Sequence, residues 1–506
     1  MLGNELRKEY GDYQTPSDFA KSVCNYIKIN LNINPLVVIE PTCGIGNFIR
    51  ASLATFENVQ KVIGVEINSQ YVEECRENNS KDKRLSVFCE NFFDFDLRHV
   101  DAISNENTLI IGNPPWATNS RLTTNLPEKI NFKGLSGTDA ITGASNFDIC
   151  EYIILKLIND FKGTNNLISM LCKTSVARNV ILELARNEVG TEFVKILEFN
   201  ASKVFGINAS ACVLMIRLAK EGNNYNRCEV VELEKPEIIK DIIICKKGSL
   251  SSDTSDVDDF EGACELEWRQ GVKHDCASIM ELSKNKENNY INKNEEILDI
   301  EDTLVFPLMK SSNFKKPLIK DDFKKYVVVT QKKARQETGV IEKLAPKTWN
   351  YLNKNKEAFE KRKSSIYKGA PSFSMFGVGD YSYAPYKVGV SGFYKNALFC
   401  LVYNENDISH PVMGDDTSYF LAFEEKDVAY ACMLLLNNKR VQNFLVSISF
   451  QDAKRPYTKK VLARISFKKC LQAISLDELI ETEKDLLLLK AISKETYEKL
   501  KKEIGQ

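Results

Sequence analysis

The stretch Leu36–Phe48, LVVIEPTCGIGNF, joins a run of apolar residues to a loop that contains two glycines. The β-branched residues before Glu40 are typical of a buried strand. Gly44 and Gly46 allow the backbone to turn sharply and a ligand to approach it closely. The loop lacks the lysine of a P-loop and the third glycine of the Gly-x-Gly-x-x-Gly fingerprint. By itself, therefore, it is equally consistent with a ligand-binding loop and with a tight strand-to-helix turn.

Further apolar runs of strand length follow, and most of them precede a helical pattern. This alternation predicts a doubly wound α/β sheet, in which ligands bind beyond the carboxyl ends of the strands. We therefore expect the loops after residues 40, 66, 90 and 112 to converge on one crevice. The expected strands are residues 36–40, 61–67, 84–90, 108–112, 166–172, 194–199 and 210–218.

Two of these loops carry side chains suited to an adenosine. Glu66 ends the strand in VIGVEIN, about twenty residues after the glycine loop, where an acid can accept both ribose hydroxyls. In CENFFDFD, Asn91 offers an amide to an adenine edge and Phe92 offers a ring to its face. Each of these residues is also compatible with ordinary packing or a surface position.

The fourth loop is the corner Asn113-Pro114-Pro115-Trp116, which follows LIIG. Prolines end the strand and restrict the backbone torsions around them. The Asn113 side-chain oxygen and the Pro114 carbonyl can then be directed at one amino group, and Trp116 supplies a flat wall for a planar base. The alternative is a buried turn with a core tryptophan, which the other three loops make less favourable.

The ordered motifs YQTP (13–16), EPTCGIGNF, VEIN, NFFDFD and NPPW resemble those of S-adenosylmethionine-dependent N6-adenine DNA methyltransferases with the gamma motif order, as in restriction-modification methylases. The resemblance covers about residues 9–218. It implies a Rossmann-like class I methyltransferase domain and S-adenosylmethionine as cofactor. The implied cofactor-binding residues are Thr15, Glu40, Pro41, Cys43, Gly44, Gly46, Asn47, Glu66, Ile67, Asn91, Phe92, Asn113 and Phe147.

The resemblance also implies the reaction. Asn113, Pro114, Pro115 and Trp116 would be the catalytic corner, and Trp116 and Phe205 would stack on a flipped target adenine. The family commonly has an acid at the position of Asn91, although an amide oxygen can also accept from an adenine amino group. Two acceptors on the exocyclic nitrogen make its lone pair available for methylation without a general base or a metal.

Alternative functions use the same corner. It could methylate an RNA base or a protein glutamine, and a DNA-binding scaffold with a vestigial methylase half is a third hypothesis. The tryptophan at 116 and the basic C-terminal half favour DNA. We find no persuasive nuclease motif. The expected partner is double-stranded DNA, and the sequence leaves open whether the methylase accompanies a separate cognate restriction endonuclease or acts alone.

Composition limits the remaining classes. The 506 residues carry a net charge of -1, which by itself does not indicate a nucleic-acid partner. The 14 cysteines contain no Cys-x-x-Cys pair and there are three histidines, which argues against a zinc site and for reduced thiols. Without a signal-peptide core or a long apolar run, we expect a cytoplasmic protein with no membrane contact and no metal.

Acidic and basic residues are unevenly distributed along the second half of the chain. Residues 251–302 carry 15 acidic against 5 basic side chains, residues 303–370 carry 17 Lys+Arg against 6 Asp+Glu, and residues 438–469 carry 9 against 1. Beside the aromatic-rich stretch 370–395, the basic stretches are more typical of a DNA-backbone surface than of a solvated face. We therefore expect a catalytic domain over 1–220, an acidic linker and domain start over 221–302, and a mixed α+β target-recognition domain over 303–506.

Overall fold

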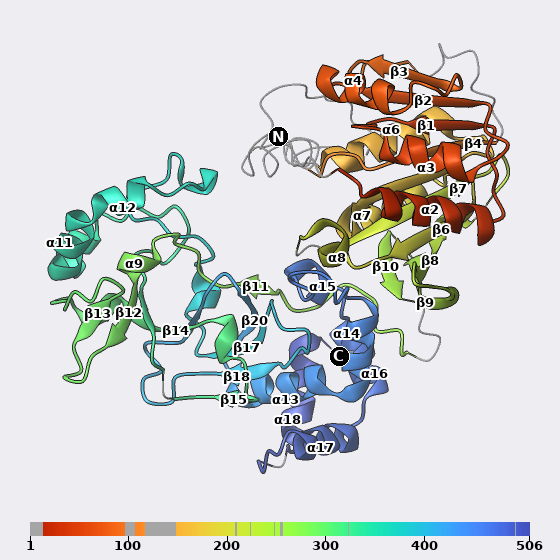
Figure 1. Cartoon of the computed structure of the whole chain (residues 1–506). Coiled ribbons are helices and arrows are strands. Elements are labelled where there is room, and N and C mark those ends of the chain that lie inside the picture. Colours follow the sequence, from red (N-terminus) through yellow and green to blue (C-terminus); the bar gives the residue numbers. More distant parts are fainter. Residues whose placement is uncertain are drawn as a thin grey trace. The chain divides into compact units, whose positions relative to one another are not determined.

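The structure is a computed structural model of the 506-residue chain. It describes residues 14–96, 107–116, 148–207, 210–222, 224–246, 248–252, 257–321, 323–490 and 492–505. The chain divides into two compact units, Met1–Asp253 (unit 1) and Thr254–Gln506 (unit 2). Figure 1 labels the helices and strands of both units.

Unit 1 is built on one twisted sheet with the strand order β10-β9-β8-β6-β7-β5-β4-β1-β2-β3. Strands β1 to β5 are mutually parallel where they pair, and β7 lies antiparallel between β5 and β6. The strands are β1 (Val37–Glu40), β2 (Lys61–Glu66), β3 (Leu85–Cys89), β4 (Thr108–Gly112), β5 (Leu167–Lys173), β6 (Thr191–Glu198), β7 (Ala211–Leu218), β8 (Arg227–Glu232), β9 (Lys235–Lys246) and β10 (Ser249–Ser252).

The predicted strands of residues 36–218 are confirmed, with ends that shift by at most three residues. The sheet is doubly wound because the chain moves outward from β1 through β2 to β3 and, on the other side of β1, from β4 to β5. Right-handed crossovers in opposite directions place α3 and α6 on opposite faces. The helices are α2 (Ser17–Ile29), α3 (Asn47–Thr55), α4 (Ser69–Asn78), α6 (Ile149–Phe161), α7 (Thr174–Arg186) and α8 (Ala201–Phe205).

The sheet continues beyond residue 220, where we expected the first domain to end. Strand β8 pairs in parallel with β6, and β9 and β10 extend the edge as antiparallel strands. The buried Cys228, Val230 and Val231 explain the attachment of β8, because their apolar side chains continue the core of the sheet. Residues 221–252 thus pack as part of unit 1.

Unit 2 contains two five-stranded sheets among its described residues, ordered β11-β20-β17-β18-β15 and β13-β12-β16-β14-β19. The strands are β11 (Arg269–Gln270), β12 (Glu281–Lys284), β13 (Tyr290–Asn292), β14 (Val305–Met309), β15 (Leu318–Ile319), β16 (Tyr326–Val328), β17 (Tyr386–Ser391), β18 (Cys400–Val402), β19 (Met413–Gly414) and β20 (Ser418–Phe423).

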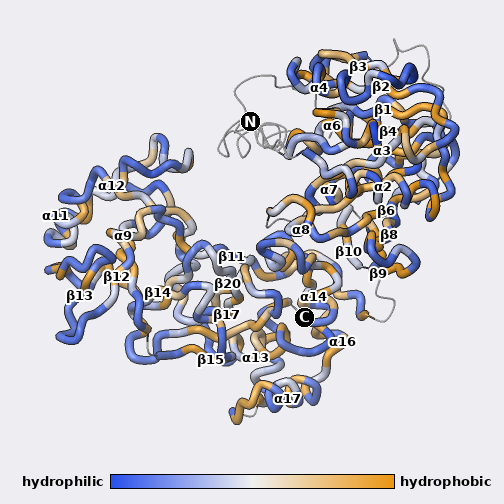
Figure 2. The backbone as a smooth tube through the Cα atoms, viewed as in Figure 1, coloured by the Kyte–Doolittle hydropathy of each residue, from blue (hydrophilic) through white to orange (hydrophobic). Residues whose placement is uncertain are grey.

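The larger core of unit 2 surrounds α13 (Lys426–Asn437), whose residues 428–436 are all buried against the first sheet and the C-terminal helices. A helix that is apolar on all sides must be enclosed on all sides, and here it is. Figure 2 shows the contrast with the hydrophilic β13 region. The other helices are α9 (Ala277–Met280), α10 (Ile341–Leu344), α11 (Pro346–Lys354), α12 (Lys356–Glu360), α14 (Lys439–Ser447), α15 (Lys459–Leu462), α16 (Phe467–Ala473), α17 (Leu476–Asp485) and α18 (Lys494–Ile504).

Candidate active site

The predicted site loops meet at one edge of the unit 1 sheet. Strand β1 pairs in parallel with β2 on one side and with β4 on the other, so their carboxyl ends point the same way. Strand β3 adds its carboxyl end next to β2. The strand order reverses between the neighbouring strands β1 and β4, and open α/β sheets bind ligands beyond the carboxyl ends of the strands at such a point.

The glycine loop after β1 needs both of its glycines. Gly44 has φ +50° and Gly46 has φ +81°, in the left-handed region that favours glycine. A Cβ on Gly44 would lie 2.7 Å from Oε1 of Gln14, and one on Gly46 would lie 2.6 Å from Sγ of Cys75. The loop backbone is therefore packed closely between the segment before α2 and the helix α4.

Asn47 ties this loop to the Gln-Thr-Pro segment. Its Nδ2 donates to the Thr15 carbonyl at 2.7 Å, and its Oδ1 accepts from the Ser17 hydroxyl at 3.2 Å. Asn47 and Thr15 are both buried. The two motifs lie 32 residues apart in the sequence and are joined here by a side chain, so the Asn47 amide positions the loop.

Two carboxylates flank the loop. Glu66, at the end of β2, accepts from the Gly44 amide through Oε2 at 2.9 Å and from the Asn68 amide through Oε1 at 2.8 Å. These two backbone hydrogen bonds hold the Glu66 carboxylate in place at the end of β2, beside the glycine loop. Glu40 is 3% exposed and accepts from the Ile49 amide, and burial raises its pKa well above the usual range.

Cys43 and Pro41 complete the loop as packed residues. The Cys43 amide donates to the Val65 carbonyl at 2.9 Å, which joins the loop to β2. The hydrogen bond with the Cys75 thiol, together with burial, raises the pKa of Cys43. Pro41 is buried as well. Their positions fix the backbone, and neither side chain is open to solvent.

The loops after β2 and β3 present an apolar wall and a capped turn. Ile67, directly after β2, is 48% exposed, so its apolar side chain is available to contact a bound planar ring. The Asn91 Oδ1 accepts from the Phe93 amide at 3.1 Å and so caps its own turn. Phe92 is 4% exposed, with the Lys156 ammonium 4.9 Å from its ring centroid. These residues fit the adenosine part of a cofactor, with Phe92 packed beneath the turn.

The corner after β4 is held by a lysine that the sequence analysis missed. Lys173, at the end of β5, donates to the Trp116 carbonyl at 3.4 Å and forms an ion pair with Asp148 at 2.7 Å. Asp148 in turn caps α6 by accepting from the Cys150 amide at 3.1 Å. Burial raises the pKa of Asp148, and Lys173 opposes that rise. Lys173 thus joins the corner to the first turn of α6.

Trp116 and Phe205, the two rings that the sequence predicts to stack on a target base, lie in contact with each other. Their ring centroids are 5.7 Å apart with an interplanar angle of 65°. Phe19 and Phe199 back this pair, with centroids 6.0 and 6.1 Å from that of Phe205. Trp116 is 8% exposed and Phe205 is half-buried. An aromatic cluster therefore closes one side of the corner.

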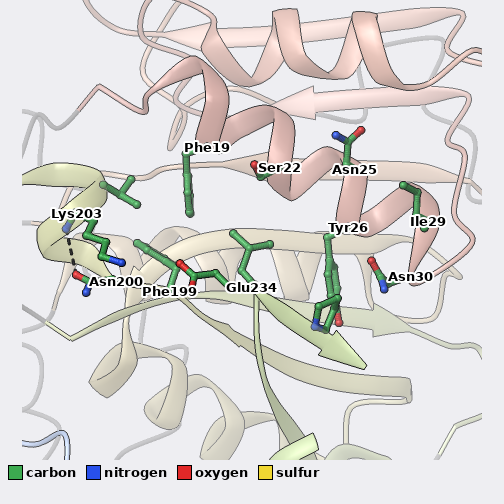
Figure 3. A pocket seen from close by; sticks show the side chains of 13 residues that line it. Phe19, Ser22, Asn25, Tyr26, Ile29, Asn30, Phe199, Asn200, Lys203 and Glu234 are labelled. Atoms are coloured by element: carbon green, nitrogen blue, oxygen red, sulfur yellow. Dashed lines mark hydrogen bonds between the residues drawn. The ribbon is translucent and has the colours of Figure 1, made fainter. Parts of the chain in front are cut away.

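Behind this cluster lies a cavity of about 430 Å³ that contains none of the predicted cofactor residues. Figure 3 shows Phe19 and Tyr26 of α2 facing the segment that carries Phe199, Asn200 and Lys203. Phe19 and Phe199 are shared between the cavity and the aromatic cluster. The cavity therefore adjoins the aromatic cluster, and none of the predicted cofactor residues lines it.

Most predicted site residues lie at this edge of the sheet. Asn113 is half-buried, Pro114 is buried, Pro115 is half-buried, and all three follow β4 directly. Phe147 and Tyr13 lie outside the described residues. Within the described ranges there is no cluster of three or more His, Cys, Asp or Glu side chains that could bind a metal. No helix in the described part of the chain is long and apolar enough to cross a membrane.

No protein-family model matches the chain. Among curated proteins, the type II methyltransferase M.NspV of Nostoc sp. is 37% identical over 488 residues, which is 93% of this chain and 98% of that protein. The type II methyltransferase M.CvrRI of Paramecium bursaria Chlorella virus XZ-6E is 23% identical over 224 residues, 44% of this chain and 52% of that protein.

Solved structures of restriction-modification proteins are also similar to this chain. One is the methyltransferase subunit of a type I restriction-modification system from Streptococcus thermophilus. The match spans 45% of this chain and 49% of that subunit, at 14% sequence identity and a TM-score of 0.32. Another is the type IIG restriction endonuclease BpuSI. The match spans 99% of this chain and 66% of that enzyme, at 13% sequence identity and a TM-score of 0.36.

Proposed function

Because this chain belongs to the type II methyltransferases, as its relationship to M.NspV over nearly its whole length shows, we propose that it methylates N6 of adenine at a specific site in double-stranded DNA. In this proposal it is the modification enzyme of a restriction-modification system and acts beside a separate endonuclease. The observation that carries the choice of adenine is the Asn113–Trp116 corner, which lies at the carboxyl end of β4 with Trp116 against Phe205.

S-adenosylmethionine is the cofactor, and it supplies a methyl group already activated on a sulfonium. The crevice fits it through groups with separate tasks. The Gly44–Gly46 backbone allows close approach, the fixed Glu66 carboxylate suits ribose hydroxyls, and the exposed Ile67 offers an apolar wall. We assign the remaining cofactor contacts to Thr15, Glu40, Pro41, Cys43, Asn47, Asn91, Phe92, Asn113 and Phe147.

In the proposed mechanism the corner prepares the adenine amino group. The lone pair of this nitrogen is delocalised into the ring, which makes it a poor nucleophile. The Asn113 side-chain oxygen and the Pro114 carbonyl each accept a hydrogen bond from one of its two N–H groups, and this favours a nitrogen whose lone pair is available. Pro115 keeps the backbone rigid, and Lys173 holds the end of the corner through the Trp116 carbonyl.

The target base must leave the duplex to reach this corner, at a cost of a few kcal/mol. Stacking on Trp116 and Phe205 would offset that cost. A base between two parallel rings needs centroids about 7 Å apart, twice the optimal carbon contact of roughly 3.5 Å. The observed rings are 5.7 Å apart and tilted by 65°, so one of them must rotate or the base must stack on Trp116 alone.

The domain assignment follows from this proposal. Residues 1–220 would catalyse, residues 221–302 would lead into the second unit, and residues 303–506 would recognise the DNA target. The observed end of unit 1 at Asp253 moves the structural boundary into the middle segment.

An incubation of the purified protein with labelled S-adenosylmethionine and separate DNA, RNA and protein fractions tests the function. Digestion of the labelled fraction should release N6-methyladenine from DNA. Label in an RNA base or in methylglutamine would keep the cofactor and the corner but would refute DNA as the substrate.

A further inference from the structure

Part of the charge segregation of the second half of the chain is resolved within unit 2. Acidic side chains of the stretch 251–302 form ion pairs with cations of the two basic stretches, 303–370 and 438–469. Where such a pair is shielded from solvent, as in Glu261–Arg464 with side chains 29% and 16% exposed, the cation has little charge left for a partner. The pairs are Asp258–Arg440, Asp259–Lys469, Glu261–Arg464, Glu267–Lys459, Glu281–Lys310, Glu296–Lys354 and Asp299–Lys347.

The loop 331–336, QKKARQ, has cations that are not used in this way. Lys332 and Arg335 are exposed, and neither has an ion pair with any residue that the structure describes. Lys333 forms a pair with Asp380 at 3.3 Å, in which both side chains are more than two-thirds exposed. Exposed pairs of this kind contribute little and are easily exchanged for another anion.

The backbone of this loop is fixed from inside. Gln331 is 3% exposed, its Oε1 accepts from the Met375 amide at 2.8 Å, and its Nε2 donates to the Gln336 carbonyl. The Tyr383 hydroxyl donates to the Gln331 carbonyl at 3.1 Å. A buried amide thus holds both ends of the loop together, and little ordering would remain for a partner to impose.

Arg335 lies at the tip of the loop. The Gln336 amide donates to the Lys333 carbonyl at 3.1 Å, which closes a four-residue turn with Arg335 in its third position. Arg335 has φ +64°, the left-handed conformation that this position takes in a type II turn. The Gln336 Oε1 accepts hydrogen bonds from the Lys332 and Lys333 amides at 2.8 and 3.2 Å. The Gln336 side chain therefore also holds the first residues of the turn in place.

Resting on the proposed function, we propose that the loop 331–336 reads duplex DNA, with Arg335 as a specificity-determining residue. A guanidinium at the tip of a rigid turn can form two parallel hydrogen bonds with O6 and N7 of a guanine in the major groove. The Lys332 ammonium, on the same loop, binds a backbone phosphate as a point charge. Gln331 is a positioning residue, because it acts only through the loop.

Sequencing that resolves N6-methyladenine in genomic DNA treated with each variant tests this assignment. The unaltered protein defines the methylated motif. Arg335→Ala should accept other bases at one G·C position, with discrimination there reduced about 5- to 150-fold. Arg335→Lys keeps the charge but loses the two parallel hydrogen-bond donors of the guanidinium. It should therefore relax the same base position while largely retaining affinity for DNA. An unchanged motif in both variants overturns the proposal.

Lys332→Ala should leave the motif unchanged, weaken DNA binding and reduce the slope of log affinity against log salt by about one. Gln331→Ala, which removes no charge, should relax the Arg335 position. The matched control is Lys484→Ala, because Lys484 is an exposed cation on α17 without an ion pair to a described residue. If Lys484→Ala relaxes the motif as Arg335→Ala does, the effect is not specific to the loop and the proposal fails.

The two levels of inference fail in different ways. If the unaltered protein methylates no DNA, the proposed function is refuted, and the loop proposal with it. If the unaltered protein methylates a defined DNA motif while the Arg335 and Gln331 variants keep that motif, only the loop proposal is refuted. Thermal melting of each variant identifies loss of fold, and Arg335→Lys keeps the test decisive if Arg335→Ala unfolds.

Discussion

Replacement of Lys173 by methionine should displace the Asn113–Trp116 corner while leaving cofactor binding unchanged. The substitution keeps most of the apolar stem and removes the ammonium. It breaks the 2.7 Å ion pair with Asp148 and the 3.4 Å hydrogen bond to the Trp116 carbonyl. None of the predicted cofactor residues has a described hydrogen bond with Lys173. Turnover should therefore fall while cofactor affinity remains.

The expected loss of stability follows from the burial of the pair. Two unit charges 2.7 Å apart attract by about 6 kcal/mol at an effective dielectric of roughly 20. The net loss is smaller, because Lys173 is 32% exposed and the Asp148 carboxyl, 11% exposed, can take up a proton once its partner is gone. We expect a loss of about 1–3 kcal/mol at neutral pH and a fall in kcat of about 10- to 100-fold.

The pH dependence gives a second signature. Burial already raises the pKa of Asp148, and removal of Lys173 raises it further. Between the pKa of Asp148 in the unfolded chain and its raised value in the folded variant, the folded state binds more protons, so stability falls as the pH rises. The loss of stability of the Lys173→Met variant, relative to the unaltered protein, should therefore be small at acidic pH and grow towards neutral pH.

Thermal melts across pH and steady-state kinetics with DNA and S-adenosylmethionine measure these effects. Adding Asp148→Asn should recover stability but not kcat, since the Trp116 carbonyl still lacks its donor. Lys240→Met is the control, because Lys240 forms pairs with Glu198 and Glu232 while half exposed, and such pairs contribute little. A Lys173→Met variant with unaltered melting and unaltered kcat would refute the reasoning.

Other predictions concern the corner and unit 2. Asn113→Ala should reduce kcat about 100- to 1,000-fold with the DNA dissociation constant retained, and turnover at the original rate in a methylation assay would exclude the amino-group role. Trp116→Ala should abolish the fluorescence rise of 2-aminopurine placed at the target position; an unchanged rise would argue against stacking. Burial lowers the pKa of Lys387 from its ordinary 10.5 to about 7. Between these values the unfolded chain binds more protons, so stability should rise with pH, and Lys387→Met should flatten this slope and stabilise unit 2 at pH 7 by on the order of 2–4 kcal/mol, as measured by urea unfolding. A slope that persists in the variant would assign it to another group.

The strands of residues 36–218 could be predicted because central strands of a parallel sheet are buried on both faces and appear as continuous apolar runs. Strand β9 could not be recognised in this way. It lies near the edge of the sheet, and most of its residues are exposed or half-buried. Its apolar residues fall in two short runs, 238–239 and 242–245, separated by Lys240 and Asp241, so the pattern is neither one continuous apolar run nor a clear alternation. Its place is fixed by the hairpin with β8, and β8 itself joins the sheet by pairing with β6, which is a long-range property of the fold.

The site shows the same division. Gly44, Glu66 and Asn113 could be located because each follows a predicted strand directly. Lys173 also follows a strand, but its role depends on Trp116 and Asp148, which lie 57 and 25 residues away in the sequence. A rule that examines every polar residue at the carboxyl end of a central strand, and not only known motifs, would have selected Lys173.

Net charge was the least informative feature of the sequence, and the ion pairs explain why. The pairs Asp258–Arg440 and Glu261–Arg464 join residues 182 and 203 positions apart, so no local window reveals them. Each such pair removes one acid and one base from the charge that a distant partner experiences. A chain with a net charge of -1 can therefore still present exposed cations such as Lys332 and Arg335, because many of its acids are engaged in pairs with other cations. Whether a protein of this composition can hold DNA is decided by which cations remain outside such pairs, and not by the sum of its charges.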